Sequence, residues 1–161
     1  MDRFHTLIAD ANKAMETADH LAYVTYPVVN DVKLLMVVVE HVHRALLNGM
    51  HALLHYDALY KRISPVPEDF KSQFLMFKAS TSRRYHIHPD ELLLIQDIKE
   101  LMDKRKASPM EFARKDKFVI ASRDYKLRTL TMSKVKNYLT TAKTFIKKVN
   151  EVQQTSGRRF T

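Results

Sequence analysis

Arg44 and His51 are the pair of residues in this sequence best suited to chemistry. They are seven positions apart, so a helix would place them on one face, about 10 Å from each other along its axis. An imidazole can exchange a proton near neutral pH, and a guanidinium can stabilise charge on a phosphate. The pair therefore suits cleavage of a phosphodiester at a ribose 2′-hydroxyl, a reaction that needs no metal.

This pair belongs to a polar stripe on a segment that is otherwise apolar, residues 31–62. Placed on a helix, the polar side chains of this segment fall within roughly 80° of one another. They are Lys33, Glu40, Arg44, Asn48, His51, His55 and Arg62. A helix that is so apolar elsewhere belongs in the middle of a fold. The polar side chains of its stripe must therefore face a cleft, a partner chain or one another. We expect Glu40, one turn before Arg44, to hold the Arg44 guanidinium.

Two other interpretations of the stripe stay open. A buried polar network could fix the packing or the dimer register without any chemistry. His51 and His55 are one turn apart and could bind one metal ion, and Glu40 with His43 forms the Glu-x-x-His pattern of di-iron bundles. The second Glu-x-x-His that such a bundle requires does not occur in the sequence. We therefore expect neither a metal nor a cofactor.

The segment from Arg44 to His51 resembles the signature of the HEPN superfamily, an Arg and a His separated by four to six residues. Here six residues intervene, and Ala45 stands where a polar residue is usual. The resemblance implies a helical bundle and metal-independent RNA cleavage, with two such helices paired across a dimer axis. By this resemblance Arg44 would hold the phosphate, His51 would transfer the proton and Glu40 would orient Arg44.

A second match to the same pattern lies at residues 83–88, Arg83-Arg84-Tyr85-His86-Ile87-His88. It keeps a polar residue after its first arginine, but its surroundings are irregular and polar. Its arginines and histidines could bind a phosphate or a metal, whereas a solvated loop is the simpler interpretation. We rank it below the first match.

Positive charge is concentrated in the C-terminal part of the chain. Residues 99–161 contain 17 Lys and Arg against 6 Asp and Glu, whereas residues 1–98 contain 10 against 12. Such an excess would attract a polyanion, and RNA is the expected partner, unless the lysines form only a solvated face. The expected nucleic-acid-binding residues are Arg114, Lys115, Lys117, Arg123, Lys126 and Arg128, together with Arg83 and Arg84. Phe118 and Tyr125 would either stack on unpaired bases or form the core of the local hairpin.

Composition restricts the class of protein. A chain of 161 residues with 45% hydrophobic residues fits one domain with its own core. Cysteine is absent, which excludes disulfides, thiolate metal sites and a cysteine nucleophile. The first 20 residues lack the apolar core of a signal peptide, and no stretch reaches about 18 uncharged apolar residues. We therefore expect a cytoplasmic protein without a membrane span. The HEPN resemblance implies in addition that the protein is a homodimer.

Helical periodicity runs through the first two thirds of the sequence. The spacing of apolar residues predicts helices over about 2–24 and 31–62, with Pro27 between them and Asn30 or Asp31 as the cap of the second. Pro65 and Pro67 end the second helix, and a third begins at Glu68. Residues 80–88 end in a loop, and Pro89 opens a fourth helix that reaches about 105.

Near residue 108 the pattern changes. Ser108, Pro109 and Glu111 predict a short helix through Ala113. The β-prone runs 117–121 and 125–130, joined by residues 122–124, predict a hairpin. Ser133 should cap a last helix, and residues 155–161 should form a loose basic tail. The whole chain, 1–161, is thus predicted to be one all-α bundle of about five helices with a small β-hairpin before the last helix.

Gly49 lies in the middle of the second predicted helix. A glycine there costs roughly 1 kcal/mol relative to alanine, so it should permit a close approach or a bend. Asn48 and Gly49 could instead form a turn that splits the helix. We prefer one helix, because the apolar periodicity keeps its phase across the glycine. If the chain were only an interaction protein, a dimer face would be expected around Gly49.

Overall fold

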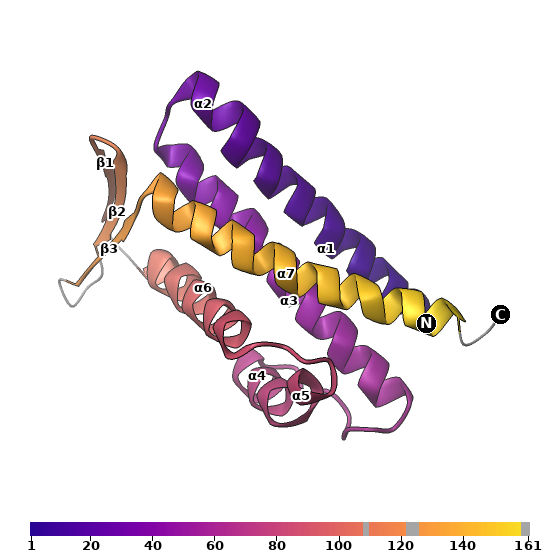
Figure 1. Cartoon of the computed structure of the whole chain (residues 1–161). Coiled ribbons are helices and arrows are strands. Elements are labelled where there is room, and N and C mark those ends of the chain that lie inside the picture. Colours follow the sequence, from indigo (N-terminus) through magenta and orange to yellow (C-terminus); the bar gives the residue numbers. More distant parts are fainter. Residues whose placement is uncertain (108–109, 122–125, 159–161) are drawn as a thin grey trace.

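The fold of this chain, in a computed structural model that describes residues 1–107, 110–121 and 126–158, is a helical bundle with a small sheet at one end (Figure 1). Three long helices run along one another: α1 (Asp2–His20), α3 (Lys33–Leu59) and α7 (Met132–Arg158). α6 (Pro89–Ala107) packs against α3 and α7. The all-α bundle and the small β element before the last helix are thus confirmed.

The chain continues in helical form beyond α1, through a π-helical segment (Leu21–Thr25) into α2 (Tyr26–Val29). Pro27 was expected to end this helix, but it lies inside α2. The amide of Tyr26 donates to the Leu21 carbonyl, five residues back. The backbone hydrogen bonds therefore change from the α-helical to the π-helical spacing just before the proline. A proline lacks an amide hydrogen, and it is tolerated at such a junction because the first amides of a helix have no internal partner.

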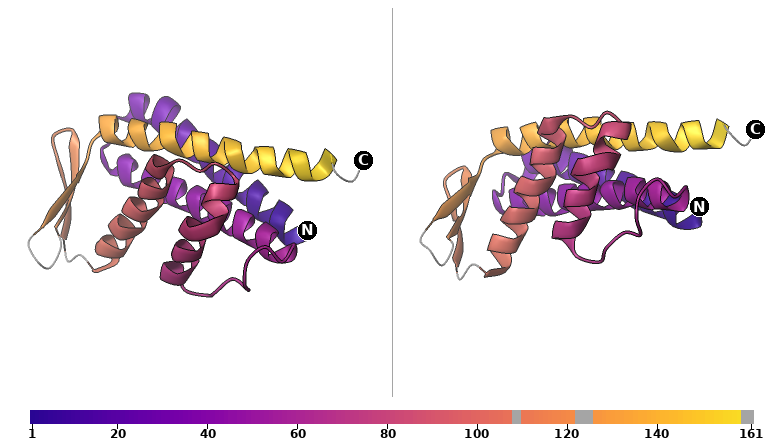
Figure 2. Two further views of the ribbon diagram at one scale, coloured as in Figure 1. Left: turned by 60° about the horizontal axis from the view of Figure 1, so that its bottom comes forward. Right: turned by 90° about the horizontal axis from the view of Figure 1, so that it is seen from below.

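α3 is one continuous helix across Asn48 and Gly49, as the periodicity predicted. The Asp31 carboxylate accepts from the Lys33 amide at its start, 3.0 Å away. After α3 the chain forms α4 (Phe70–Met76), a second π-helical segment (Phe77–Thr81) and α5 (Ser82–Arg84). α4 and α6 lie side by side in both views of Figure 2. α4 begins two residues after the predicted Glu68, because Asp69 caps it by accepting from the Ser72 amide at 2.9 Å.

The short helix predicted through Ala113 is wrong. Residues Met110–Arg114 form strand β1, which pairs with β2 (Lys117–Ala121), and β2 pairs with β3 (Leu127–Leu130). The result is one antiparallel sheet in the order β1-β2-β3. The predicted hairpin corresponds to β2 and β3, although its connecting residues 122–124 lie outside the described residues. Residues 110–114 form a strand and not a helix, because their backbone groups pair with those of β2 in the sheet.

Helix α7 also departs from the prediction at both ends. Thr131 rather than Ser133 caps it, since the Thr131 hydroxyl accepts from the Lys134 amide at 3.2 Å. The helix then continues through Arg158, so the expectation of a loose tail is wrong for residues 155–158. Ser156 is buried there. Residues 159–161 of the predicted tail lie outside the described residues.

Gly49 permits the close contact between α3 and α7. A Cβ atom at this position would lie 2.7 Å from Cε1 of Phe145 and 3.3 Å from Cδ1 of Ile146. The glycine is therefore packed inside the bundle and does not mark a dimer face. Phe145 is fully buried, so its ring has no room to move away from an added methyl group.

Gly49→Ala is expected to lower the free energy of unfolding by about 1–2 kcal/mol, because overpacking of the core exceeds the gain in helix propensity. Urea denaturation of the purified variant measures this change. Gly157→Ala is the matched control, since a Cβ atom there would meet nothing within 4 Å. It should leave the stability unchanged or raise it slightly. A Gly49→Ala variant as stable as Gly157→Ala would show that α3 and α7 are not so tightly packed.

Candidate functional site

A groove between α3 and α6 brings the predicted Arg44 and His51 together. It has a volume of about 420 Å³. We call it the α3–α6 groove and define it by its lining residues, which are Glu40, His43, Arg44, Leu47, Asn48, His51, Lys99, Met102, Asp103 and Lys106. The polar stripe of α3 thus forms one wall of the groove, and α6 supplies the other.

Arg44 is exposed in this groove. Within the described residues its guanidinium forms no hydrogen bond or ion pair, so it can bind an anion from outside. The expectation that Glu40 holds Arg44 is not met, because Glu40 forms an ion pair with Arg105 of α6. Arg105 also binds Glu111 of β1, 2.7 Å away. Arg105 therefore links α3 to the sheet, and Glu40 is drawn away from Arg44.

His51 is held in one orientation by Gln73 of α4. The Gln73 side-chain nitrogen donates to the Pro67 carbonyl at 2.8 Å and to the Glu68 carbonyl at 3.2 Å. Carbonyl oxygens only accept, so the Gln73 side-chain oxygen must be the atom 2.9 Å from Nε2 of His51. The proton of a neutral His51 ring therefore lies on Nε2, and Nδ1 carries a lone pair that can accept a proton.

The electrostatics of the groove favour an anionic ligand. Lys99 pairs with Asp103 at 2.9 Å, one turn apart on α6. Lys106 forms no ion pair within the described parts of the chain, so it adds a second available cation to Arg44. Leu47 and Met102 provide apolar surface between these charges. The groove thus offers two unneutralised cations beside an imidazole of fixed orientation.

His43 lies in the same groove and stays neutral at physiological pH. Burial of the ring, with a smaller contribution from the neighbouring Lys99 and against the opposite effect of Asp103, lowers its pKa from 6.5 to about 4. The pKa of His41, on the other side of Arg44, is lowered by burial and by Arg44 itself. The lowered pKa values favour the neutral form of both imidazole rings, so Arg44 does not share an anionic ligand with a charged His41 or His43.

The His43 pKa predicts how stability depends on pH. Between pH 6.5 and pH 4 the unfolded chain binds a proton at this position and the folded chain does not, so the free energy of unfolding falls as the pH falls through this window. With allowance for solvent screening, the loss is about 1–2 kcal/mol. Urea denaturation of wild type and His43→Gln at pH 7 and pH 4.5 measures it. The variant should lose less stability than wild type, and His55→Gln, at an exposed position on the same helix, should not differ from wild type. Equal losses in all three would contradict a neutral, buried His43.

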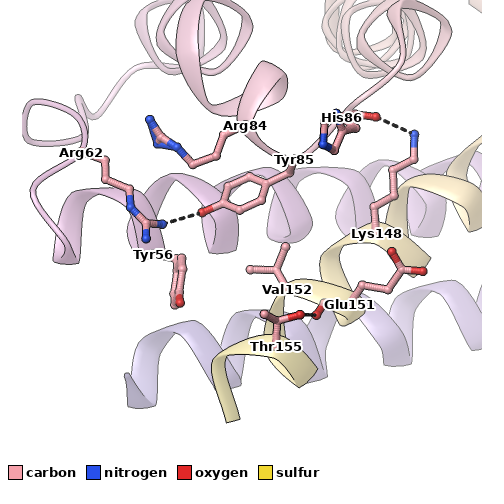
Figure 3. A pocket seen from close by; sticks show the side chains of 9 residues that line it. All are labelled: Tyr56, Arg62, Arg84, Tyr85, His86, Lys148, Glu151, Val152 and Thr155. Atoms are coloured by element: carbon pink, nitrogen blue, oxygen red, sulfur yellow. Dashed lines mark hydrogen bonds between the residues drawn. The ribbon is translucent and has the colours of Figure 1, made fainter. Parts of the chain in front are cut away.

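The second Arg/His match, residues 83–88, occupies a different pocket (Figure 3). Its Arg84 pairs with the fully buried Asp57 at 3.2 Å, and the Tyr85 hydroxyl donates to the same carboxylate at 2.5 Å. Figure 3 shows Arg62 reaching the Tyr85 hydroxyl and Lys148 reaching the His86 carbonyl, at 3.2 Å and 2.9 Å. This segment thus ties the end of α3 to α5 and α7.

The Tyr85 hydroxyl remains protonated, because burial and the hydrogen bond to Asp57 raise its pKa. It can therefore donate to Asp57 throughout the physiological range. Arg83 is exposed, whereas Arg84 is occupied by Asp57. The arrangement is that of a structural network, in which the buried Asp57 carboxylate joins the end of α3 to α5, and Lys148 of α7 binds the His86 carbonyl.

The basic residues predicted on the hairpin divide between the two faces of the sheet. Arg114, Lys115 and Lys117 line a hollow on the side away from the bundle. Arg128 lies on the opposite face, against Tyr138 of α7. Lys126 is exposed, and Arg123 lies outside the described residues. Phe118 is buried in the core, which confirms the alternative that it packs inside, and Tyr125 lies outside the described residues.

Sequence reasoning missed Lys99 and Lys106, which line the groove, and Gln73, which holds His51. A signal existed for α6, where Lys99, Met102, Asp103 and Lys106 recur at the spacing of one helix face. No comparable signal marks Gln73, because its contact with His51 depends on how α4 folds back onto α3.

No protein-family model matches this chain, and neither a curated protein nor a solved structure does. No group of three or more His, Cys, Asp or Glu side chains within the described residues could hold a metal ion. In the same parts of the chain, no helix has both the length and the apolar character to cross a membrane.

Proposed function

We propose that this chain binds RNA and cleaves it without a metal, as a HEPN-like ribonuclease that uses the α3–α6 groove. One observation carries the proposal: the unpaired Arg44 guanidinium and the Gln73-held His51 line the same groove. A base whose orientation is fixed by a third group, beside a cation for the phosphate, is the arrangement that phosphodiester cleavage requires.

In the proposed reaction, Nδ1 of His51 removes the proton from a ribose 2′-hydroxyl. The 2′-oxygen then attacks the adjacent phosphorus, the bond to the 5′-oxygen breaks, and this leaving oxygen takes a proton from water. The products are a 2′,3′-cyclic phosphate and a 5′-hydroxyl. Arg44, with Lys106 beside it, stabilises the negative charge that develops on the phosphate. His51 afterwards returns its proton to solvent.

Gln73 acts in this scheme as a positioning residue. It holds Nε2 of His51 and so directs Nδ1 to the substrate. Glu40 has a different role from the one first expected, because it binds Arg105 and keeps α6 in place against α3. Arg44 is then oriented by the substrate itself, which supplies the only anion that its guanidinium needs.

The test is incubation of the purified protein with end-labelled single-stranded RNA in EDTA. DNA of the same sequence and RNA with one 2′-deoxy position serve as matched controls. We expect cleavage of RNA alone, a block at the deoxy position, and a 2′,3′-cyclic phosphate end. Salt-sensitive binding without cleavage would instead identify a non-catalytic RNA-binding module. Neither binding nor cleavage would contradict both nucleic-acid functions.

A further inference from the structure

The sheet has one face that the bundle does not cover. We call it the outer sheet face and define it by the residues that strand alternation places on this side and that line one hollow, Phe112, Arg114, Lys117, Val119, Leu127 and Thr129. The strand register supports this set, because Phe112 is opposite Val119, and Val119 is opposite Thr129. The other face carries Phe118, Ile120 and Leu130, which are buried in the core. A hollow of about 330 Å³ lies on the outer sheet face and extends over Lys115 and Asp116 at its turn.

Apolar side chains are exposed on this outer sheet face. Phe112 is 38% exposed and Leu127 is 62% exposed. The sheet stands at the end of the bundle in both views of Figure 2 and packs on it through its other face, so no helix of the described residues covers the outer sheet face. An exposed apolar patch bordered by charges is typical of a binding surface. An aromatic ring presented by a sheet is also suited to stacking against an unpaired base.

Cations are gathered at one end of the same face. Arg114 lies directly opposite Lys117 in the β1–β2 pair, and Lys115 is at the turn between them. Like charges at directly opposite positions destabilise a sheet. Within the described residues none of these three cations forms an ion pair, and Asp116 at the same turn offsets only one of their three charges. Lys115 also has a φ of 55°, in the left-handed region that favours glycine. Repulsion and strain at one turn indicate a surface arranged to bind an anion.

We propose that the outer sheet face binds an unpaired segment of RNA, with a base stacked on Phe112 and the backbone phosphates at Arg114, Lys115 and Lys117. A duplex hides the faces of its bases, so the preferred ligand is single-stranded. The proposal shares with the proposed function the premise that RNA is the ligand, but it does not depend on cleavage. An acidic peptide would satisfy the cations and would not use the exposed ring, and the ring therefore distinguishes the two ligands.

The experiment measures binding by fluorescence anisotropy, with His51→Ala as the background protein so that the RNA stays intact. The probes are a labelled 12-nucleotide oligo-U and an RNA duplex of the same length. Phe112→Ala should weaken binding of oligo-U by roughly 5- to 150-fold, the range expected for one lost stacking contact. The double variant Arg114→Gln/Lys117→Gln should reduce the slope of log affinity against log salt by about 1.4, for two lost phosphate contacts.

Two controls remove the same chemical groups elsewhere. Leu93→Ala removes an apolar side chain that is 55% exposed on α6, and Lys71→Gln/Lys147→Gln removes two exposed cations from α4 and α7. Neither should change the affinity by as much as the sheet variants. Circular dichroism of each variant verifies that the fold is retained, and Phe112→Leu provides a second variant that keeps apolar area and loses the aromatic ring.

Several outcomes would overturn the proposal. Equal affinity for oligo-U and duplex, with no effect of Phe112→Ala, would exclude stacking on the sheet. Binding lost in Arg44→Ala and kept in all sheet variants would show that the α3–α6 groove alone holds RNA. Displacement of RNA by polyglutamate regardless of Phe112 would favour an acidic peptide. If wild type cleaved RNA and the sheet variants bound RNA as tightly as their background protein, this proposal would be wrong and the proposed function would stand. If the protein bound no RNA at all, this proposal and the proposed function would both be contradicted.

Discussion

His51→Ala is expected to lower the rate of RNA cleavage by about 10²- to 10⁴-fold, the contribution typical of a general base. The variant loses the imidazole that Gln73 holds and that lines the α3–α6 groove. His43 cannot replace it, because burial lowers the pKa of its ring to about 4 and leaves it a weak base. The measurement is the single-turnover rate on end-labelled RNA in EDTA. RNA affinity should be nearly unchanged, because His51 is proposed to transfer a proton and not to hold the phosphate.

Matched variants separate this effect from a structural one. His51→Asn keeps a donor for the Gln73 oxygen and loses the base, so it should be as inactive as His51→Ala. His55→Ala removes an exposed imidazole one turn further along α3 and should retain full activity. Arg44→Ala should lower the rate by about 10²- to 10³-fold, as the loss of one electrostatic contact to the transition state. Cleavage by His51→Asn at the wild-type rate would exclude His51 as the base.

Asp57→Ala is expected to lower the free energy of unfolding by about 3 kcal/mol, near the lower end of the range for a broken buried ion pair. Asp57 is fully buried and accepts from Tyr85, Arg84 and Arg62 at 2.5 Å, 3.2 Å and 3.5 Å. The two arginine side chains are 29% and 33% exposed, so they can turn toward water when the carboxylate is removed. The half-buried Tyr85 hydroxyl loses the acceptor of its proton, and this adds to the loss.

Urea denaturation at pH 7 measures this change, and Asp103→Ala is its control. Asp103 also pairs with a cation, Lys99, but its side chain is 55% exposed, so its removal should cost no more than about 0.5 kcal/mol. Asp57→Asn keeps the shape of the side chain and should be less damaging than Asp57→Ala. If Asp57→Ala and Asp103→Ala were equally stable, the network around Tyr85 would not hold the end of α3 to α5.

The helices could be predicted wherever the sequence is periodic over many residues. The single helix through Asn48 and Gly49 and the Pro89 start of α6 are clear examples. Predictions were wrong where a contact distant in sequence decides the local structure. β1 is a strand because β2 pairs with it, and Pro27 stays helical because a π-helical segment precedes it. Local preference at these residues does not contain that information.

The candidate site shows the same division. Arg44 and His51 could be placed on one face of one helix, because both lie on α3 and helix geometry fixes their spacing. Glu40 was predicted to bind Arg44 on the same grounds, but it forms its ion pair with Arg105 of α6 instead. Gln73 orients His51 from a separate helix, 22 residues along the chain. Contacts within one helix follow from sequence, whereas contacts between helices require their packing.

The first and last helices of the bundle are neighbours, and this has a consequence for biosynthesis. Asn12 of α1 and Asn150 of α7 exchange side-chain hydrogen bonds at 2.9 Å and 2.8 Å, across 138 residues of chain. α7 also provides the side chains that cover Gly49 on α3. α3 therefore leaves the ribosome before α7 has been synthesised. The apolar side chains of α3 that α7 covers stay exposed until residues 132–158 emerge. Folding of the bundle is thus delayed until residues 132–158 have been translated, and a chaperone that shields apolar segments would be most useful before that point.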